Sequence, residues 1–404
     1  MTDTPPAPPA CGASAAPDTP RECILCGRCL DVCPLFRATG REELSPKAKH
    51  YLNKFLDTRP GELDTKPAAS LASLCLACGR CEKECPQGLS GPAVVASLRG
   101  KHAAWESWLW KTWIERGGVL WPALGALARF APDGLAGERF APMLKLLKAM
   151  TRRKTEPWLA VTRYDVIPSC ANGPQAALFP GCTAQHAQPA WLGTARALLA
   201  GVGYAVLPEP DWACCGLTLA HAGLPDSHAL MMRRNIDLWR KAGRPQLAVF
   251  CATCLHGLTA YADPANAHVT AWEPGEAQAW LAALAPLSGL LRGTQFTPTP
   301  SAPDRVLYHR PCHGANTTAD LDLLRAILGD RLVRTSTDAC CGMGGVMQLG
   351  APELSRQVAA ACWDFFDAQP GDHLLTGCSG CVIQLRATAP QGVTVSHWLD
   401  CIAP

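Results

Sequence analysis

Two segments near the N-terminus each place four cysteines and a proline in the same order. The segment RECILCGRCLDVCP contains Cys23, Cys26, Cys29 and Cys33, and the segment SLCLACGRCEKECP contains Cys75, Cys78, Cys81 and Cys85. In such a C-x2-C-x2-C-x3-C-P run, three thiolates surround one four-iron cluster and the fourth reaches a second cluster. The repeat predicts two [4Fe-4S] clusters with crossed ligands: Cys23, Cys26, Cys29 and Cys85 for the first, and Cys33, Cys75, Cys78 and Cys81 for the second.

The alternative for these eight thiols is a pair of structural zinc sites, because zinc also binds C-x2-C pairs. Zinc sites seldom use two identical four-cysteine runs with trailing prolines, so clusters are favoured. Between the runs, KAKHYLNKFLDT has apolar side chains at Tyr51, Leu52, Phe55 and Leu56, which is the spacing of an amphipathic helix. We therefore expect a helical ferredoxin-like domain.

The second half of the chain repeats a five-cysteine pattern built around two adjacent cysteines. The first copy contains Cys182, Cys214, Cys215, Cys251 and Cys254, and the second contains Cys312, Cys340, Cys341, Cys378 and Cys381. Cysteines matched in the same order indicate a duplicated module. In each copy, short apolar strands alternate with helices, which predicts βαβ units on a parallel sheet with the cysteines at the strand ends.

Five thiols exceed the four ligands that tetrahedral zinc or a cubane cluster takes. Adjacent cysteines bind one metal ion only with strain, but they can bind two irons of one cluster. Each set therefore predicts a non-cubane iron–sulfur cluster, with Gly216 and Gly342 letting the backbone pass close to it. The alternatives are a redox disulfide between Cys214 and Cys215, or zinc on four thiols of one set.

These patterns predict an α+β and α/β architecture, in which an N-terminal α-helical ferredoxin-like domain precedes a duplicated α/β Cys-Cys-Gly module. The expected divisions are a disordered tail (1–20), the ferredoxin-like domain (21–100), a basic, tryptophan-rich helical connector (101–170), the first module (171–300) and the second module (301–404).

The connector is basic and rich in tryptophan. Residues 101–154 contain ten Lys and Arg against four acidic residues, with Trp105, Trp108, Trp110, Trp113 and Trp121. Short helices broken at Gly117, Gly118 and Pro122 would suit the headgroup region of an anionic membrane. An equally weighted alternative is that the tryptophans pack on the ferredoxin-like domain or on a partner subunit.

The composition indicates the cellular compartment of the protein and excludes some classes of partner. The 404 residues include 22 cysteines and carry a net charge of +3, and the first 20 have neither the basic start nor the apolar core of an export signal. We therefore expect a cytoplasmic protein whose thiols hold metal. No apolar stretch is long enough to cross a membrane, and nothing in the sequence indicates nucleic acid as a partner.

Histidines accompany the module cysteines. His186, His256 and His309 are expected to be structural or to donate hydrogen bonds to sulfur, whereas His313 is a candidate proton donor in thiol chemistry. No other catalytic residue is assigned. The remaining cysteines are expected to be ordinary buried or tail thiols: Cys11, Cys170, Cys362 and Cys401.

Two ferredoxin-type runs followed by two Cys-Cys-Gly modules resemble the glycolate oxidase iron–sulfur subunit family, which has relatives in anaerobic glycerol-3-phosphate dehydrogenase and heterodisulfide reductase. The segments FPGCTAQHA, YHRPCHGAN, CCGMGGVMQL and GVTVSHWLD carry the resemblance. Many glycolate oxidase subunits keep only the second cysteine of each late C-x-x-C pair. This chain keeps both cysteines of each pair, as heterodisulfide reductase does, so both relationships stay open.

No G-x-G-x-x-G segment follows a predicted strand, so flavin is expected on another subunit. The resemblance implies an FAD-containing partner that oxidises a 2-hydroxy acid, glycolate or D-lactate, while this chain passes the electrons toward a quinone. The alternative is a heterodisulfide reductase-like catalytic subunit that reduces a disulfide at a non-cubane cluster. A zinc-holding scaffold protein is the third hypothesis.

Overall fold

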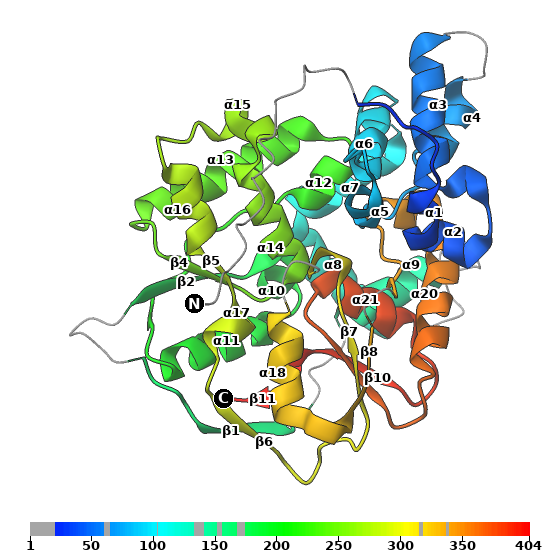
Figure 1. Ribbon diagram of the computed structural model, residues 1–404. Coiled ribbons are helices and arrows are strands. Elements are labelled where there is room, and N and C mark those ends of the chain that lie inside the picture. The colour runs from blue at the N-terminus through cyan, green and yellow to red at the C-terminus, as the bar shows by residue number, and fades with distance from the viewer. Residues whose placement is uncertain are drawn as a thin grey trace, which may run out of the picture.

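The computed structural model describes residues 21–59, 65–102, 104–132, 141–151, 156–167, 174–314, 318–336 and 339–404. Within these residues, a group of N-terminal helices lies beside two α/β modules (Figure 1). The expected tail, Cys11 and Cys170 lie outside the described residues. The domain boundaries given above stay predictions.

The N-terminal part is helical. Its elements are α1 (Arg28–Val32), α2 (Pro34–Thr39), the 3-10 helix η1 (Glu42–Leu44), α3 (Pro46–Thr58), α4 (Thr65–Ala72), α5 (Arg80–Glu84) and α6 (Gly91–Lys101). The helix expected between the cysteine runs is α3. The two runs fold alike, because α1 and α5 each follow a glycine with positive φ, 84° at Gly27 and 72° at Gly79. Glycine adopts this conformation without a steric penalty.

Three further helices form the connector: α7 (Trp105–Glu115), α8 (Gly117–Phe130) and α9 (Ala141–Met150). The expected break at Pro122 is wrong, since α8 continues through it. Pro122 removes a single backbone hydrogen bond near the start of the helix, and the carbonyl that its ring would crowd belongs to Gly118, whose backbone adapts easily. No helix in the described part of the chain is both long enough and apolar enough to cross a bilayer.

The tryptophans of the connector divide into two groups. Trp110 and Trp121 are buried in a core with Met150, and Trp113 stacks on Trp121 with a ring separation of 5.3 Å. This core also includes Leu219 and Ile383, so the connector packs against both modules. In contrast, the side chains of Trp105 and Trp108 are 60% and 67% exposed.

The first module is a four-stranded parallel sheet in the order β3-β2-β4-β5. Its strands are β2 (Gln175–Phe179), β3 (Ala205–Val206), β4 (Gln246–Val249) and β5 (Leu284–Pro286). Its α-helices are α10 (Gly181–His186), α11 (Pro189–Gly201), α12 (Leu217–His221), α13 (Pro225–Lys241), α14 (Ala252–Thr259), α15 (Ala267–Thr270), α16 (Glu276–Ala283) and α17 (Leu287–Leu290). The sequence did not predict β5.

The second module has the same order, β8-β7-β9-β10, and is also parallel. Its strands are β7 (Val306–His309), β8 (Leu332–Ser336), β9 (His373–Thr376) and β10 (Thr394–His397). Its α-helices are α18 (Ala319–Leu328), α19 (Met347–Gly350), α20 (Pro352–Phe366) and α21 (Ser379–Thr388). Parallel sheets flanked by helices are consistent with the expected duplication.

Central strands of both sheets are continuous apolar runs. Every residue of β7 and β9 is buried, as are the last four residues of β2. Such runs are typical of parallel strands covered by helices on both faces. In register, Phe179 pairs with Val249 in the first sheet, and His309 pairs with Thr376 in the second. The loops that follow these strands therefore start at one edge of each sheet.

A third, smaller sheet connects distant parts of the chain. It has the order β11-β1-β6, from β1 (Leu159–Arg163), β6 (Gln295–Pro298) and β11 (Ile402–Ala403). β1 pairs parallel with β11 and antiparallel with β6. The end of the second module is thereby joined to the segment that precedes the first module.

Candidate iron–sulfur centres

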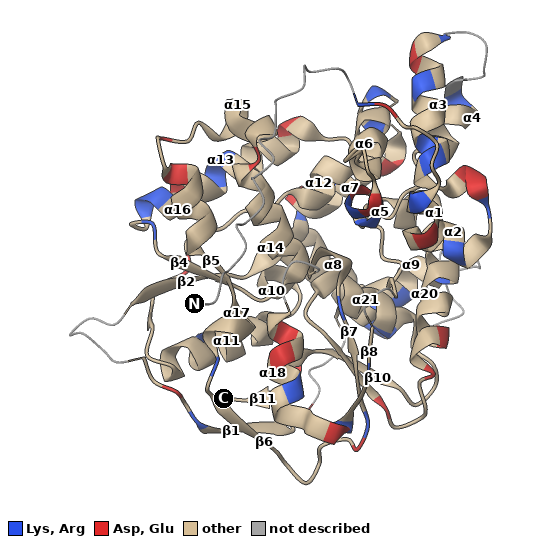
Figure 2. Ribbon diagram, viewed as in Figure 1, with Lys and Arg blue, Asp and Glu red and all other residues tan. Residues whose placement is uncertain are grey.

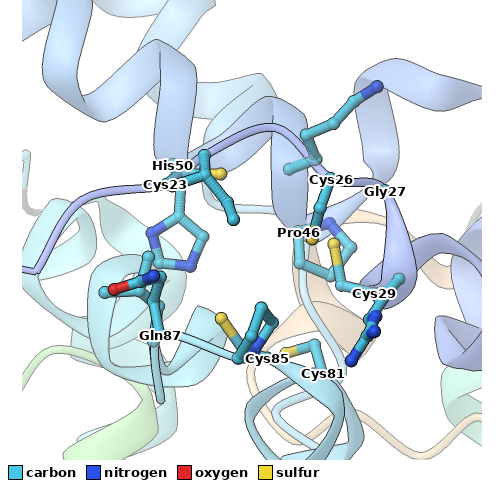
Figure 3. Close-up of a pocket in the computed structure, with 14 residues that line it drawn as sticks. Cys23, Cys26, Gly27, Cys29, Pro46, His50, Cys81, Cys85 and Gln87 are labelled. Carbon is cyan, nitrogen blue, oxygen red and sulfur yellow. The ribbon is translucent and has the colours of Figure 1, made fainter.

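The outer site lies where the two cysteine runs meet, close to the surface. Cys23, Cys26, Cys29 and Cys85 line one pocket, and Cys81 also reaches its wall (Figure 3). Three of these cysteines come from the first run, and Cys85 follows α5 of the second run. Cys26 is exposed. This pocket contains the four thiols that the sequence predicts for the first cluster.

The inner site is a neighbouring pocket lined by Cys33, Cys75, Cys78 and Cys81. Burial, together with the nearby Cys312, raises the pKa of Cys78 to about 12, and burial raises the pKa of Cys81 to about 12. Metal binding must remove these protons, because only the thiolate is a ligand. Both pockets take a fourth cysteine from the opposite run, an arrangement that fits the crossed pattern. The ligand sets themselves stay predictions.

The first five-cysteine set gathers at the carboxyl end of its sheet. Cys182 lies on α10 after β2, Cys214 and Cys215 precede α12, and Cys251 and Cys254 surround the start of α14. Hydrogen bonds with Cys182 and Cys215 lower the pKa of Cys214 well below its ordinary value. Cys254 is within hydrogen-bonding reach of both Cys215 and Cys251. All five thiols therefore belong to one connected group.

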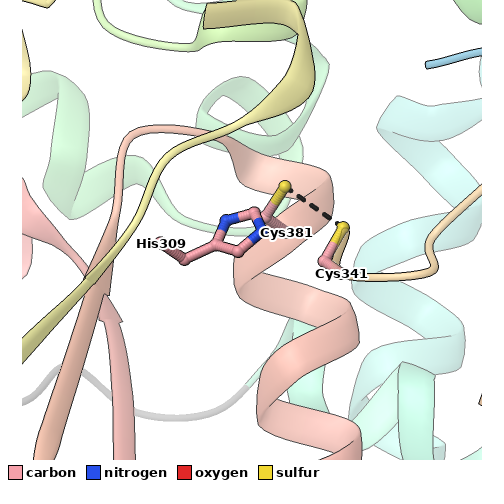
Figure 4. A group of neighbouring side chains, drawn as sticks. All are labelled: His309, Cys341 and Cys381. Carbon is pink, nitrogen blue, oxygen red and sulfur yellow. Dashed lines mark hydrogen bonds between the residues drawn. The ribbon is translucent and has the colours of Figure 1, made fainter. Parts of the chain in front are cut away.

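The second set, Cys312, Cys340, Cys341, Cys378 and Cys381, is arranged in the same way. The sulfurs of Cys341 and Cys381 lie 3.2 Å apart (Figure 4). Hydrogen bonds with Cys340 and Cys381 lower the pKa of Cys341 well below its ordinary value. Burial raises the pKa of Cys312 to about 12, with Cys341 contributing. Cys381 is also within hydrogen-bonding reach of Cys378, so four thiols of this set are linked and the half-buried Cys312 lies near them.

The two sets meet between the modules, which the sequence did not indicate. Cys251 of the first set is within hydrogen-bonding reach of Cys378 of the second, and this contact raises the pKa of Cys378 to about 12. The amide of Ala252 donates to the carbonyl of Gly377 at 2.8 Å. The helices that lead away from the first set here, α10 and α14, carry no Lys, Arg, Asp or Glu (Figure 2).

The second set also adjoins the inner site. The guanidinium of Arg80 donates to the carbonyl of Ala339 at 3.0 Å, which connects α5 to the loop before Cys340. Nε2 of His313 lies 3.0 Å from the carbonyl oxygen of Ala77, within the second cysteine run. The four groups of thiols consequently form a row: outer site, inner site, second set and first set.

Comparison with known proteins also separates a ferredoxin-type part of the chain from two cysteine-rich modules. Residues 20–89 match the family model of a 4Fe-4S dicluster domain, and residues 176–259 and 306–386 match that of a cysteine-rich domain. Together these matches cover more than half of the chain. The chain belongs to the family of iron–sulfur subunits that join these domains. These domains and their many cysteines indicate that the chain holds iron–sulfur clusters.

Relatives of this iron–sulfur subunit extend over nearly its whole length. It is 25% identical to the probable glycolate oxidase iron-sulfur subunit of Bacillus subtilis, covering 90% of this chain and 88% of the relative. It is 24% identical to the glycolate oxidase iron-sulfur subunit of Escherichia coli, covering 95% and 93%. It is 25% identical to a subunit of the dihydromethanophenazine:CoB–CoM heterodisulfide reductase of Methanosarcina mazei, covering 89% and 86%.

Glycines next to the adjacent cysteines allow close packing in both modules. Gly216 and Gly342 do adopt positive φ angles, 75° and 81°. However, a Cβ would lie 2.7 Å from the ring of His228 at Gly216, and 2.4 Å from the carbonyl oxygen of Ser355 at Gly342. These glycines therefore permit tight packing on α13 and α20, and their expected closeness to a cluster stays a prediction. Gly181 is a glycine packed against a thiol, since its Cβ would lie 2.6 Å from Sγ of Cys254.

His309 lies beside two sulfurs of the second site, a position that suits one of its two expected roles, hydrogen bonding to sulfur. One of its ring nitrogens, Cys341 Sγ and Cys381 Sγ all lie within 4.8 Å of one another (Figure 4). Nδ1 lies 3.3 Å from the hydroxyl of Thr376. Among the described residues, Nε2 is buried without a hydrogen-bond partner. His309 is therefore available to the sulfurs of this site, and no spacing in the sequence distinguishes it from the other histidines near the cysteines.

His313 lies between the module sites and the inner site. Its Nδ1 is 3.1 Å from the hydroxyl of Thr253, and that hydroxyl is 3.2 Å from Sγ of Cys378. Burial lowers the pKa of His313. The candidate role of His313 as a proton donor stays a prediction. Cys362 and Cys401 are buried outside the cysteine sets, as expected of ordinary core thiols.

Proposed function

We propose that this chain is the electron-transfer subunit of a flavin-dependent 2-hydroxy-acid dehydrogenase, with glycolate or D-lactate as the substrate of the complex and a quinone as its final acceptor. Two relatives named as glycolate oxidase iron-sulfur subunits support this assignment. The sequence offers no dinucleotide motif for flavin, so the hydride acceptor belongs to a partner flavoprotein.

The observation that carries the proposal is the row of four thiol groups. The ferredoxin-type cysteines hold two [4Fe-4S] clusters, and the five-cysteine sets hold one or two non-cubane clusters, with zinc in one set as the alternative. Cys312 is near enough to Cys78 to raise its pKa, and Cys251 is within hydrogen-bonding reach of Cys378, so neighbouring sites adjoin. The chain's own residues supply the ligands, which are buried or half-buried except for the exposed Cys26, and the clusters supply the redox chemistry.

The isolated chain should reduce no acceptor when glycolate or D-lactate is added. A hydride needs a flavin, and the proposed flavin lies on another subunit. Addition of the partner flavoprotein should start reduction of a soluble quinone analogue, followed by its absorbance under anaerobic conditions. Heat-inactivated flavoprotein serves as the control. Turnover of either hydroxy acid by the isolated chain would contradict the subunit assignment.

A second candidate function is reduction of a disulfide by the chain itself. The observation that favours it is the completeness of both five-cysteine sets and their meeting at Cys251 and Cys378. The relative named as a heterodisulfide reductase subunit is similar over most of the chain. Stoichiometric turnover of a disulfide by the reconstituted chain, with a reduced viologen as electron donor, would favour this candidate over the first.

Peripheral membrane contact is part of the proposal, because the acceptor is a quinone. α8 turns an apolar stripe outward: Val119, Pro122, Ala123, Ala126, Leu127 and Phe130 are all exposed. Exposure reaches 87% at Phe130, and Trp105 and Trp108 of α7 are also exposed. The helices α7, α8 and α9, together with Arg116 between the first two, carry five basic and two acidic residues. This combination suits an anionic lipid surface.

The buried face of α8 lies against the first module. Trp121 contacts the ring of His186 at a centroid distance of 5.8 Å, and His186 belongs to α10, the helix of Cys182. A membrane at the outer stripe would therefore be close to the last thiol group of the row. This position would suit electron delivery to a quinone.

Vesicles containing phosphatidylglycerol should carry the protein upward in a flotation gradient. Each basic side chain near such a surface contributes about 1 kcal/mol, so flotation should decrease as salt is raised. The double substitution Leu127→Glu/Phe130→Glu should abolish flotation, because it places charge in the inserting stripe. Leu230→Glu, at an exposed apolar position on α13, is the matched control and should float like the wild type. Salt-insensitive flotation, or none, would assign the stripe to a partner subunit instead.

A further inference from the structure

The inner site contains a buried lysine. Lys49, in the first turns of α3, is only 2% exposed and lines the pocket formed by Cys33, Cys75, Cys78 and Cys81. Its ammonium group donates a hydrogen bond to the carbonyl of Leu44. Burial lowers the pKa of Lys49, and the negative charge of Cys75, Cys33 and Cys81 opposes that shift. Lys49 therefore shares one pocket with all four thiols of the inner site.

No carboxylate in the described part of the chain forms an ion pair with Lys49. Other lysines of α3 do have such partners: Lys47 pairs with Glu42, and Lys54 lies 2.5 Å from Glu22. A buried ammonium without a paired charge is strongly unfavourable, whereas an exposed one is not. The protein thus retains an energetically costly lysine beside the inner pocket. The four thiols of that pocket would become anionic on binding metal, and the positive charge would then have negative neighbours.

A second buried cation lies close to the backbone of Cys75. The guanidinium of Arg99 on α6 donates to the carbonyls of Ser73 at 2.6 Å and Cys75 at 3.2 Å. Arg99 is 8% exposed, and the charge of Cys75 opposes the lowering of the Arg99 pKa that burial causes. The outer pocket differs, because its cations are an exposed Arg28 and the Glu42-paired Lys47.

We infer that Lys49, assisted by Arg99, is the counter-charge of the inner cluster and makes that cluster easier to reduce. A four-iron cluster with four thiolates is negatively charged and becomes more so on reduction. A fixed positive charge in a poorly solvated pocket stabilises the reduced form, and net charge and solvent exposure are known to set cluster potentials. At the outer pocket, Arg28 is screened by water and salt and the charge of Lys47 is offset by Glu42, so both act more weakly.

This inference rests on the proposed function, because it requires a cluster at the inner site. The test is a redox titration of the anaerobically purified full chain, with the reduced clusters followed by electron paramagnetic resonance. The inner signal is identified by its loss in Cys33→Ser. Lys49→Met should make reduction of the inner cluster at least tenfold less favourable, which corresponds to a potential about 59 mV lower for one electron. The outer signal should move less.

Two further variants distinguish the effect of the Lys49 charge from the effect of altered side-chain packing. Lys49→Arg keeps the charge and should leave the reduction equilibrium of the inner cluster within about threefold of the wild type. Lys54→Met removes an exposed lysine of the same helix and should change neither signal. If Lys49→Met fails to retain the inner cluster while Lys49→Arg retains it, the requirement for charge is again supported. An unchanged inner potential in Lys49→Met with full iron content would overturn the inference.

The cluster-free protein provides an independent readout. Without a cluster, Lys49 has no counter-charge, so Lys49→Met should raise the melting temperature of the apoprotein relative to wild-type apoprotein. A lower melting temperature of the apoprotein variant would show that the ammonium stabilises the fold itself, against the inference. Absence of iron from the wild-type chain would instead refute the proposed function, so the two failures are distinguishable.

Discussion

Replacing Cys214 and Cys215 together by serine should remove iron from the first five-cysteine set and spare both ferredoxin-type clusters. The wild-type chain, purified anaerobically, should contain clearly more than the roughly eight irons that two four-iron clusters hold. Cys214 is hydrogen-bonded within a connected group of five thiols and its pKa is well below the ordinary value, so it is a strong candidate thiolate ligand. The loss should therefore be a whole cluster.

Iron and zinc analysis with electron paramagnetic resonance measures this result. Iron should fall substantially toward the cubane level, while the ferredoxin-type signals keep their intensity. Cys401→Ser is the matched control, since Cys401 is fully buried but lies outside both sets. An iron content of the wild type that stops at the cubane level, with zinc making up the remainder, would defeat the assignment of non-cubane clusters.

Replacing Cys85 by serine should damage the outer cluster, although Cys85 belongs to the second cysteine run. The outer pocket brings Cys85 together with Cys23, Cys26 and Cys29, while the inner pocket does not include it. The expected result is loss of one cluster signal, the one that the substitution Cys26→Ser also removes. Electron paramagnetic resonance of the reduced variants, with iron analysis, makes the comparison.

The reciprocal variant completes the test of crossed ligation. Cys33→Ser should remove the inner signal, which Cys78→Ser also removes, because these two cysteines line the inner pocket. If Cys85→Ser removed only the signal associated with Cys75, Cys78 and Cys81, each run would hold its own cluster. The crossed arrangement would then be wrong.

Much of the site could be predicted because the cysteine spacings are local. In each ferredoxin-type run, a glycine with positive φ before α1 or α5 positions the third cysteine, and this turn is determined within a few residues. The buried strands β2, β7 and β9 are likewise visible as apolar runs. Duplication then led to the expectation that both modules place their cysteines at strand ends.

Other expectations failed where packing overrides local preference. Pro122 is a helix breaker in isolation, yet α8 passes through it on a surface where the lost hydrogen bond costs little. The close packing of Gly216 and Gly342 on α13 and α20 was not predicted, because no local pattern indicates it. The five tryptophans of the connector look alike in sequence, but burial separates Trp110 and Trp121 from the exposed Trp105 and Trp108.

The grouping of the thiols follows from the order of residues along the chain, because ligand spacing, strand periodicity and duplication are all visible there. How the groups adjoin follows from tertiary packing instead. Cys251 meets Cys378 across 127 positions of sequence (378 − 251), and Lys49 is buried without a carboxylate partner among the described residues. The physical reason is that contacts between modules, and the burial of a charge, depend on how distant segments pack. No spacing within one segment encodes them.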